Sequence, residues 1–312
     1  MHGLDLFSIG SWTVFDHIFK MSQYPNNGDT VTLDMPVENT QKSYFGDCSA
    51  NIAAVASRLG LKVGLGMVVG EDFNFSGYRD HMTRLGVDLN GVLVLPGKTS
   101  GHSYLYFDNH GDGFCISHLG VAADQSDWQA PVDIIRRSRF VVINEMFSNY
   151  TLQAAKSAHA VGATVVINGM VGTAGGLAEE FVSNADILFI AKKELANLLA
   201  LFRLDNPALL LDRGLSMLFA TQGKKGCHVF SRNGIEEVPI VKVDDVVDTT
   251  GSGDAFAAGT ITGLIKGLEP TVAAQMGATV SSFIIQDWGC QTNLPTWEQV
   301  LERHHRHNWE TE

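Results

Sequence analysis

The chain has 312 residues, of which 45% are hydrophobic and 18% are charged, and this balance excludes a disordered protein. Its length suits one large globular domain, or one domain with a small appendage. The formal net charge is −12 and the Lys and Arg residues do not cluster, so no nucleic-acid partner is expected.

The N-terminal run Leu4 to Ile9 predicts a strand, and it lacks the basic and long apolar segments of a signal peptide. No run reaches about 18 uncharged apolar residues, so no membrane partner is expected. The four cysteines are scattered and show no C-x-x-C spacing; they are Cys48, Cys115, Cys227 and Cys290. This pattern favours reduced thiols and a cytoplasmic protein.

Short runs rich in Val, Ile, Leu and Phe recur along the chain and predict buried parallel strands; they lie at 63–69, 139–144, 163–168, 186–190 and 215–220. Helix-like segments alternate with them, near 49–59, 73–85, 150–161 and 192–201. Gly60, Gly86 and Gly162 stand where three of these helices are expected to end. The alternation predicts an α/β fold, with a mostly parallel sheet covered by helices on both faces.

Two stretches, 30–45 and 99–116, show strand-like alternation and little helical pattern. The second contains Ser103 to Phe107, followed by a turn at 108–113. We interpret both stretches as strands of a small β-sheet outside the main body. Such a sheet could be a lid that excludes water from a site, or simply a peripheral sheet.

Near the C-terminus, the run Phe230 to Ile235 contains Asn-Gly and predicts a hairpin, with a strand at 236–241 after it. Two helices are expected next, at about 253–266 and 270–286. The second begins at Pro270, a favourable residue for a first helical turn.

Between that strand and the first of these helices lies Asp248-Thr249-Thr250-Gly251-Ser252-Gly253-Asp254. Small residues at 251–253 let backbone N–H groups approach an anion at a helix N-terminus. Asp254 then stands beside that anion, where a carboxylate can accept a proton from an attacking hydroxyl. The alternative is that Asp254 only stabilises the start of the helix. For Asp248 we expect a capping or bracing role.

Two weaker signals accompany this motif. The run Thr221 to Gly226 has two glycines and two lysines after a strand, which suits a loop beside nucleotide phosphates or a plain solvent turn. The run Phe45 to Asn51 opens a helix. Asn51 could bind a polyol there, while Asp47 or Ser49 could cap the helix.

With these motifs the chain resembles the ribokinase-like family of carbohydrate and nucleoside kinases, also called the PfkB family. The run 248–254 is the most specific mark, and a second mark runs from Gly46 and Asn51 through Arg58-Leu59-Gly60 to Gly70-Glu71-Asp72. Both marks occur in the family's order, and the resemblance extends from Ile9 to Gly289.

The resemblance implies a three-layer α/β core with a small β-sheet lid, ATP as phosphoryl donor, Mg²⁺, and a monovalent cation such as K⁺. It implies that residues 1–312 form a single kinase domain, with the lid formed by about 30–45 and 99–116. By matching position, Asp254 is the catalytic base, and Gly251, Ser252 and Gly253 form the anion hole. Asp16, Gly46, Asn51 and Glu145 match positions near the substrate. Thr221, Gly223, Gly226 and Gly289 match positions near the nucleotide.

The chain departs from the family pattern at two places. The family usually has two glycines where this chain has Gly46-Asp47, so we expect Asp47 to contact or select the substrate. The family motif Asn-x-x-Glu is Ala191-Lys192-Lys193-Glu194 here. Glu194 is retained as the expected metal-binding residue, but loss of the Asn puts metal affinity in doubt.

The main functional hypothesis is a kinase that phosphorylates a hydroxyl of a small sugar or sugar derivative. The first alternative is a nucleoside kinase of the same fold, in which Trp12 and Phe15 would stack on a base unless they pack around the first strand. The second is a catalytically weak sugar-sensing regulator. Apolar alternation at 103–107 is compatible with a homodimer through the lid.

Overall fold

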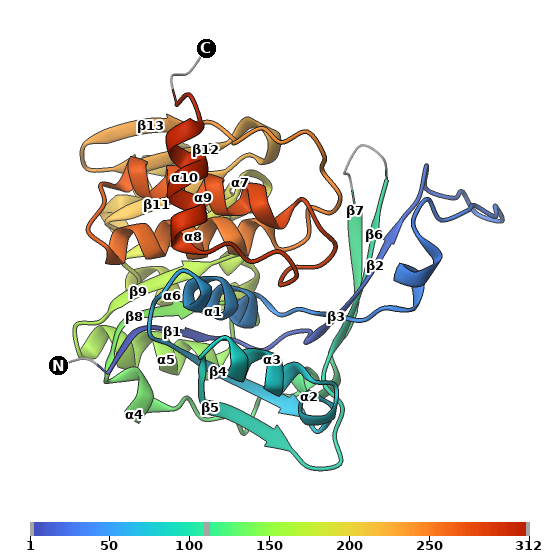
Figure 1. Cartoon of the computed structure of the whole chain (residues 1–312). Helices are drawn as coiled ribbons and strands as arrows, with labels where there is room; N and C mark the ends of the chain where they lie inside the picture. The colour runs from blue at the N-terminus through green and yellow to red at the C-terminus, as the bar shows by residue number, and fades with distance from the viewer. Residues whose placement is uncertain (1–2, 109–112, 310–312) are drawn as a thin grey trace.

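The computed structural model describes residues 3–108 and 113–309, and its main body is built on one large sheet (Figure 1). Within the described residues this sheet has nine strands in the order β13-β12-β11-β10-β9-β8-β1-β4-β5. Their bounds are β1 (Leu4–Ile9), β4 (Val63–Gly70), β5 (Asp88–Leu95), β8 (Ser138–Ile143), β9 (Thr164–Asn168), β10 (Ile187–Ala191), β11 (Met217–Thr221), β12 (Cys227–Ser231) and β13 (Gly234–Val238). Strands β11 to β5 run parallel, and the β12–β13 hairpin adds two antiparallel strands at one edge.

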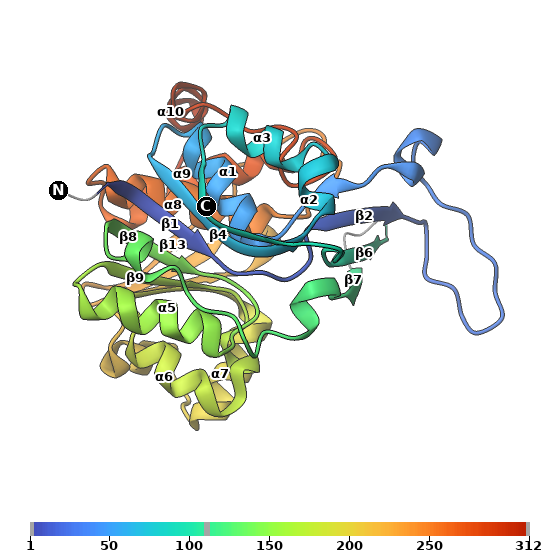
Figure 2. The ribbon, with the colours of Figure 1, turned by 90° about the horizontal axis from the view of Figure 1, so that it is seen from below.

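Helices form a layer on each face of the sheet, as Figure 2 shows. One layer contains α1 (Cys48–Arg58), α2 (Asp72–Phe75), α3 (Tyr78–Arg84), α8 (Ser252–Ile265), α9 (Pro270–Ile284) and α10 (Trp297–Arg306). The other contains α4 (Val132–Ile135), α5 (Asn149–Ala160), α6 (Ala178–Ser183) and α7 (Lys192–Phe202). Short 3-10 helices lie in the connections: η1 (Val37–Gln41), η2 (Gly120–Ala123), η3 (Val171–Leu177), η4 (Pro207–Arg213) and η5 (Gly223–Lys225).

Each face of the sheet has its own hydrophobic core because side chains alternate along a strand. On β8, Val142 packs in the core shared with α1 and α8, whereas Val141 and Ile143 pack in the core shared with α5. These strands are therefore apolar on both sides, which is why they appear in the sequence as continuous apolar runs.

Helix α8 packs closely against α9, and glycines allow the close approach. A Cβ on Gly259 would lie 2.9 Å from the Cα of Gly277, and a Cβ on Gly277 would lie 2.5 Å from the carbonyl oxygen of Phe256. Helix α8 is consequently buried from Asp254 to Gly263. Its first turn, which carries Asp254, is fixed by this packing.

A second sheet projects from the main body (Figure 1). Its strands are β3 (Tyr44–Phe45), β2 (Phe15–Lys20), β6 (His102–Phe107) and β7 (Gly113–His118), in that order across the sheet. Strands β2 and β6 are parallel and the other two pairs are antiparallel. We call this second sheet the lid.

The structure confirms the predicted α/β fold, the strands in the main body and the hairpin after Phe230. Gly60, Gly86 and Gly162 do end helices, with φ of +92°, +81° and +73°. The helix expected at 73–85 is instead two helices, because Gly77 adopts φ +86° between them.

The strands expected at 30–45 are largely wrong. That stretch contains η1, the two-residue strand β3 and an isolated bridge between Met21 and Leu33. The longer lid strand at this side is β2, which the sequence pattern did not identify. The range 99–116 does contain β6 and most of β7, while residues 109–112 of the expected turn lie outside the described residues.

In the described ranges, no helix combines the length and the apolar character that crossing a membrane requires. Cys48, Cys115, Cys227 and Cys290 are free thiols.

Candidate active site

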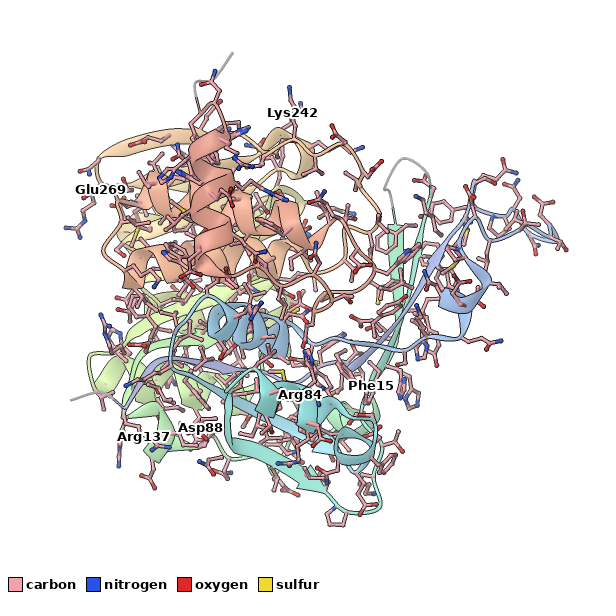
Figure 3. The ribbon with its side chains drawn as sticks, in the orientation of Figure 1. Phe15, Arg84, Asp88, Arg137, Lys242 and Glu269 are labelled. Atoms are coloured by element: carbon pink, nitrogen blue, oxygen red, sulfur yellow. The ribbon has the colours of Figure 1, made fainter. Side chains whose placement is uncertain are left out.

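The candidate site lies at the carboxyl ends of the parallel strands, under the base of the lid. Gly10 follows β1, Asn144 and Glu145 follow β8, and Asn168 is the last residue of β9. The carboxyl ends of parallel strands share one edge, where α/β proteins commonly bind ligands. Strand β2 leaves the main body from this edge, beginning at Phe15 (Figure 3).

Asp254 lies in the first turn of α8 and is 8% exposed. Each of its carboxylate oxygens accepts a hydrogen bond from a side-chain amide: Asn51 Nδ2 donates to Oδ2 at 2.9 Å, and Asn168 Nδ2 donates to Oδ1 at 2.9 Å. Burial raises the pKa of Asp254 to about 6, and the two amide donors oppose that rise. Asp254 is therefore ionised at neutral pH, and its pKa lies close to neutral pH, which suits a general base.

The loop before Asp254 has the shape of an anion site. Gly251 adopts φ +72° at the N-cap of α8, and a Cβ there would overlap Cys290. Ser252 donates its N–H to the carbonyl oxygen of Thr249, but the described residues offer no acceptor to the N–H groups of Gly251 and Gly253. Gly253 is exposed, and a Cβ there would meet nothing within 4 Å. Backbone donors at a helix N-terminus thus face open space, as phosphate binding requires.

Asp248 braces this loop, as the sequence predicted. Its Oδ1 accepts from the N–H and hydroxyl of Thr250 at 2.9 and 2.6 Å, and its Oδ2 accepts from the N–H of Gly289 at 2.9 Å. Gly289 has φ +81°, and a Cβ there would overlap the ring of Tyr44 on lid strand β3. The anion loop, the segment after α9 and the lid are therefore joined at this point.

Asp16 lies on the second residue of β2 and is 5% exposed. A Cβ on Gly46 would overlap its carboxylate, so glycine at position 46 makes room for it. Cys290 Sγ donates to Asp16 Oδ2 at 3.7 Å, and Ser103 of β6 also hydrogen-bonds the carboxyl group. Burial raises the pKa of Asp16 to about 7. A carboxylate in this place can accept hydrogen bonds from two substrate hydroxyls.

Asp47 is the N-cap of α1. Its Oδ1 accepts from the N–H of Ser49 at 2.9 Å, and its Oδ2 accepts from the N–H of Trp12 at 2.7 Å. The residue adopts φ +73°, a conformation that favours glycine, which is the residue the family usually has there. The structure gives Asp47 the capping role considered from the sequence, and its effect on substrate choice stays a prediction.

Glu145 and Glu194 form an acidic pair beside Asp254. Burial, together with the charges of Asp254 and Glu194, raises the pKa of Glu145 to about 8. Glu194 stands in the first turn of α7, where Oε2 accepts from the N–H of Ala191 at 3.0 Å. Ala191 is thus the N-cap residue of α7, and Glu194 makes the half of a capping box that an alanine cap still allows, the bond to the N-cap N–H.

The residues predicted to contact the nucleotide follow β11. Thr221 ends that strand, and Gly223 to Lys225 form the exposed turn η5. Gly226 adopts φ +85° and packs against the carbonyl oxygen of Val238, so the turn has one defined path. Lys224 of this turn lines the same cavity as Asp248 and Thr249, which brings the turn beside the anion loop.

That cavity measures about 170 Å³ and lies between the lid and the main body. It is lined by Ile18, Lys20, Phe107 and Asp108 of the lid, and by Lys224, Val246, Val247, Asp248, Thr249 and Trp288 of the main body. Ile18 is two residues beyond Asp16 on the same face of β2, and the charge of Asp248 acts on Asp16. Asp16 does not line the cavity itself, but two of the lining residues, Ile18 and Asp248, are its neighbours.

The site carries excess negative charge. None of the ion pairs among residues 3–108 and 113–309 includes Asp16, Glu145 or Asp254. The described chain also holds no group of three or more His, Cys, Asp or Glu that could bind a metal by itself. Mg²⁺ in kinase sites typically takes one or two protein carboxylates together with phosphate oxygens. Glu145 and Glu194 fit that requirement, and a metal–nucleotide complex would relieve their repulsion.

Sequence reasoning missed Asn168, Ser103, Cys290 and Gln291, which all contact the predicted site residues or their neighbours. One signal was available for Asn168, since it is a polar residue directly at the end of a predicted buried strand. Phe15 is not placed as the nucleoside alternative suggested. It is 4% exposed and packs on Tyr78 and His102, whereas Asp16 faces the other side of β2.

An α/β sheet with a small sheet as lid, a glycine-rich anion loop and a buried aspartate beside it defines a kinase that transfers a phosphoryl group to an alcohol. The sequence model described as "pfkB family carbohydrate kinase" matches residues 13–297, which is most of the chain. The protein belongs to this family, and it is a phosphotransferase with an alcohol acceptor.

The chain is similar to the nucleoside kinase of Methanocaldococcus jannaschii, with 26% identity over 306 residues that cover 95% of each chain. It is also similar to the ribokinase of Haemophilus influenzae, with 24% identity over 296 residues that cover 92% of this chain and 94% of the other.

Among solved structures, the M. jannaschii nucleoside kinase superposes with a TM-score of 0.84 at 25% identity, covering 98% of this chain and 99% of that one. A Burkholderia thailandensis nucleoside kinase in complex with inosine has a TM-score of 0.83 at 20% identity, covering 96% and 97%. At 20% identity, the similarity to the B. thailandensis enzyme shows only a shared ribokinase fold.

Proposed function

We propose that this protein is an ATP-dependent nucleoside kinase that phosphorylates a hydroxyl of the nucleoside's ribose. The main hypothesis from the sequence is a small sugar or sugar derivative as acceptor, with a nucleoside as the first alternative. The similarity to nucleoside kinases over nearly the whole chain favours that alternative.

The observation that carries the proposal is the cavity between the lid and the main body, whose lining includes Ile18, two residues beyond Asp16 on β2. Its walls include the large apolar side chains of Ile18, Phe107, Val246 and Trp288. A free sugar bound at Asp16 would leave these walls without a partner. A nucleoside would bury its base there, and aromatic rings such as those of Phe107 and Trp288 stack well on bases.

In the proposed reaction, Asp16 binds the sugar hydroxyls and so orients the acceptor. Asp254 accepts the proton of the attacking hydroxyl as the hydroxyl oxygen bonds to the γ-phosphorus of ATP. The bond from that phosphorus to the β–γ bridging oxygen breaks at the same time, and ADP leaves. The N–H groups of Gly251 and Gly253 stabilise the negative charge on the transferred phosphoryl group. Closure of the lid over the acceptor would exclude water, which otherwise competes as acceptor.

ATP would lie along the loops at 221–226 and 251–253, and Mg²⁺ would neutralise its phosphate charge. Glu145 and Glu194 are the carboxylates we propose to hold the metal. The side-chain amide, with its carbonyl oxygen, that the family's Asn would have offered is absent at Ala191, so we expect a weaker metal site than in family members that retain it. The monovalent cation near Gly289 stays a prediction.

A matched pair of tryptophan variants tests the acceptor. Trp288→Ala should raise KM for a nucleoside about tenfold and leave KM for ribose nearly unchanged, because only the base would contact this ring. Trp297→Ala is the control, because Trp297 begins α10 and stacks with Lys266 away from the cavity. ADP release would be measured with inosine, adenosine, cytidine, ribose and fructose. Turnover on free sugars alone, with no effect of Trp288→Ala, would show that the acceptor is a sugar.

The outer face of the lid supports a homodimer. Tyr104, Phe114 and Ile116 are 37%, 49% and 57% exposed and lie on one face, since Tyr104 pairs with Ile116 in register and Phe114 with Tyr106. Sedimentation of the wild type and of Ile116→Lys would test this, and a wild-type monomer at micromolar concentration would contradict it.

A further inference from the structure

Gln291 lies in the segment between α9 and α10, is 6% exposed, and uses its whole amide in hydrogen bonds. Nε2 lies 2.9 Å from Asn51 Oδ1 and 2.7 Å from the hydroxyl of Tyr78. Oε1 lies 3.1 Å from His81 Nε2. These partners come from α1 and α3, so Gln291 joins two helices that flank the lid.

The direction of every hydrogen bond in this network follows from Asp254. A carboxylate only accepts, so the Nδ2 group of Asn51 must face Asp254 and Oδ1 must face Gln291. Oδ1 in turn needs a donor, so Nε2 of Gln291 faces Asn51. The carbonyl oxygen of Gln291 then faces His81, which must carry a proton on Nε2.

The second donor of Gln291 extends the network to the lid. Its Nε2 also donates to the hydroxyl of Tyr78, and that hydroxyl donates to the carbonyl oxygen of Gly46 at 2.5 Å. Gly46 lies between lid strand β3 and helix α1. Tyr78 is fully buried and stacks on Phe45 of β3, with ring centroids 4.2 Å apart. Gln291 therefore contacts Asn51, which holds Asp254, directly, and it reaches the base of the lid through Tyr78.

We propose that Gln291 is a positioning residue for phosphoryl transfer, because it fixes the Asn51 amide with its NH₂ group toward Asp254. The proposal rests on the role of Asp254 as base in the proposed function. Without Gln291 the buried Oδ1 of Asn51 loses its donor, and the amide is free to rotate. A rotated amide would present its oxygen to the Asp254 carboxylate, which repels the charged form of the base.

Loss of Gln291 should therefore make Asp254 retain its proton to higher pH. The other titratable groups that act on Asp254 or are acted on by it are Asp47 and Cys48 of α1, Glu145 after β8, and Cys290 beside Gln291. None of these groups is substituted in the two glutamine variants below, so we expect a change at Asp254 to report the Asn51 amide.

The test compares Gln291→Leu with Gln286→Leu. Gln286 follows α9 and its Oε1 accepts from Arg303 at 3.0 Å, so its loss removes a similar amide outside the network. The protonation midpoint of Asp254 would be measured by ¹³C NMR on carboxyl-labelled aspartate, with Asp254→Asn to assign its resonance. This measurement needs no acceptor substrate, so it decides the proposal even if nucleosides are not the acceptor.

We expect Gln291→Leu to move the midpoint of Asp254 up by about one pH unit and to lower kcat about tenfold, with little change in KM for ATP. Gln286→Leu should change neither value. In an Asn51→Ala background, Gln291→Leu should have no further effect on kcat, because the residue acts through Asn51.

Two results would overturn the proposal. One is an unchanged midpoint of Asp254 in Gln291→Leu, whatever happens to thermal stability. The other is an equal fall of kcat in the presence and absence of Asn51, which would mean that Gln291 acts by another route.

Discussion

The raised pKa of Asp16 has a consequence for stability that can be measured without any substrate. The folded protein holds this carboxyl group with a pKa of about 7, against 3.8 when it is free in solution. Between pH 3.8 and about pH 7, the folded state therefore binds more protons at this carboxyl group than the unfolded state does. Ionisation of Asp16 therefore costs stability as the pH rises, and the cost is complete above about pH 7.

The size of this cost follows from the two pKa values. It is about 4 kcal/mol at pH 8.5 and about 2 kcal/mol at pH 5.5. Asp16→Asn removes the charge with almost the same volume and keeps an oxygen that accepts hydrogen bonds from Ser103. The variant should therefore be more stable than the wild type by up to these amounts, at the expense of acceptor binding.

Thermal unfolding at the two pH values would measure the effect. A chain of this length gains about 1.5 °C in Tm per kcal/mol, so Asp16→Asn should raise Tm by up to about 6 °C at pH 8.5 and about 3 °C at pH 5.5. Asp133→Asn is the control, because the side chain of Asp133 is 99% exposed and the charge change is the same. A Tm gain that is absent, or equal at both pH values, would refute the reasoning.

Three further substitutions test the site. Asn168→Ala removes one of the two amide donors to Asp254. We expect kcat to fall about 10- to 100-fold and the acid limb of the pH–rate profile to move to higher pH. An acid limb at the wild-type pH would contradict this. Gly46→Ala puts a methyl group against the Asp16 carboxylate. KM for the acceptor should then rise at least about tenfold, while calorimetry finds ATP binding unchanged. A normal KM would exclude a contact between Asp16 and the acceptor. The hydroxyl of Tyr44 is buried without a hydrogen-bond partner among the described residues. Tyr44→Phe should therefore leave the free energy of unfolding in urea unchanged or raise it by about 1 kcal/mol. A clear fall in that free energy would show that the hydroxyl does have a partner.

The main body could be predicted from the sequence because its signals are local. Buried strands such as β8 and β9 are apolar on both faces and end in turn residues. The anion loop combines small residues with an aspartate in a run of seven. The helix at 73–85 was predicted as one element because Gly77 is compatible with a helix until its φ is known.

The lid was harder to predict because its strands pair over long distances. Strand β2 pairs with β6, about 87 positions further along the chain. Its six residues place Asp16, Ile18 and Lys20 on one face and the rings of Phe15, His17 and Phe19 on the other, so neither face is a plain apolar one. The polar alternation at 30–45 looks equally strand-like, but within it only Leu33 and the two residues of β3 find a pairing partner. Local pattern cannot distinguish these two stretches.

The same limit applies to the site. Asp254 was identified from its motif, but the residues that hold it are remote: Asn51 is 203 positions away, and Asn168 is 86 positions away. Gln291 contacts Asn51 across 240 positions. Only the fold brings these amides together, so only the fold explains how a buried aspartate keeps a pKa as low as about 6.

The central claim is that this kinase transfers a phosphoryl group from ATP to a nucleoside with Asp254 as base. Single-turnover transfer of labelled γ-phosphate to inosine, by the wild type and by Asp254→Asn, tests it most directly. The account predicts a labelled nucleoside monophosphate with the wild type, and a rate lower by about 10²- to 10⁴-fold in the variant with ATP affinity retained. A variant that transfers phosphate at nearly the wild-type rate would contradict the account.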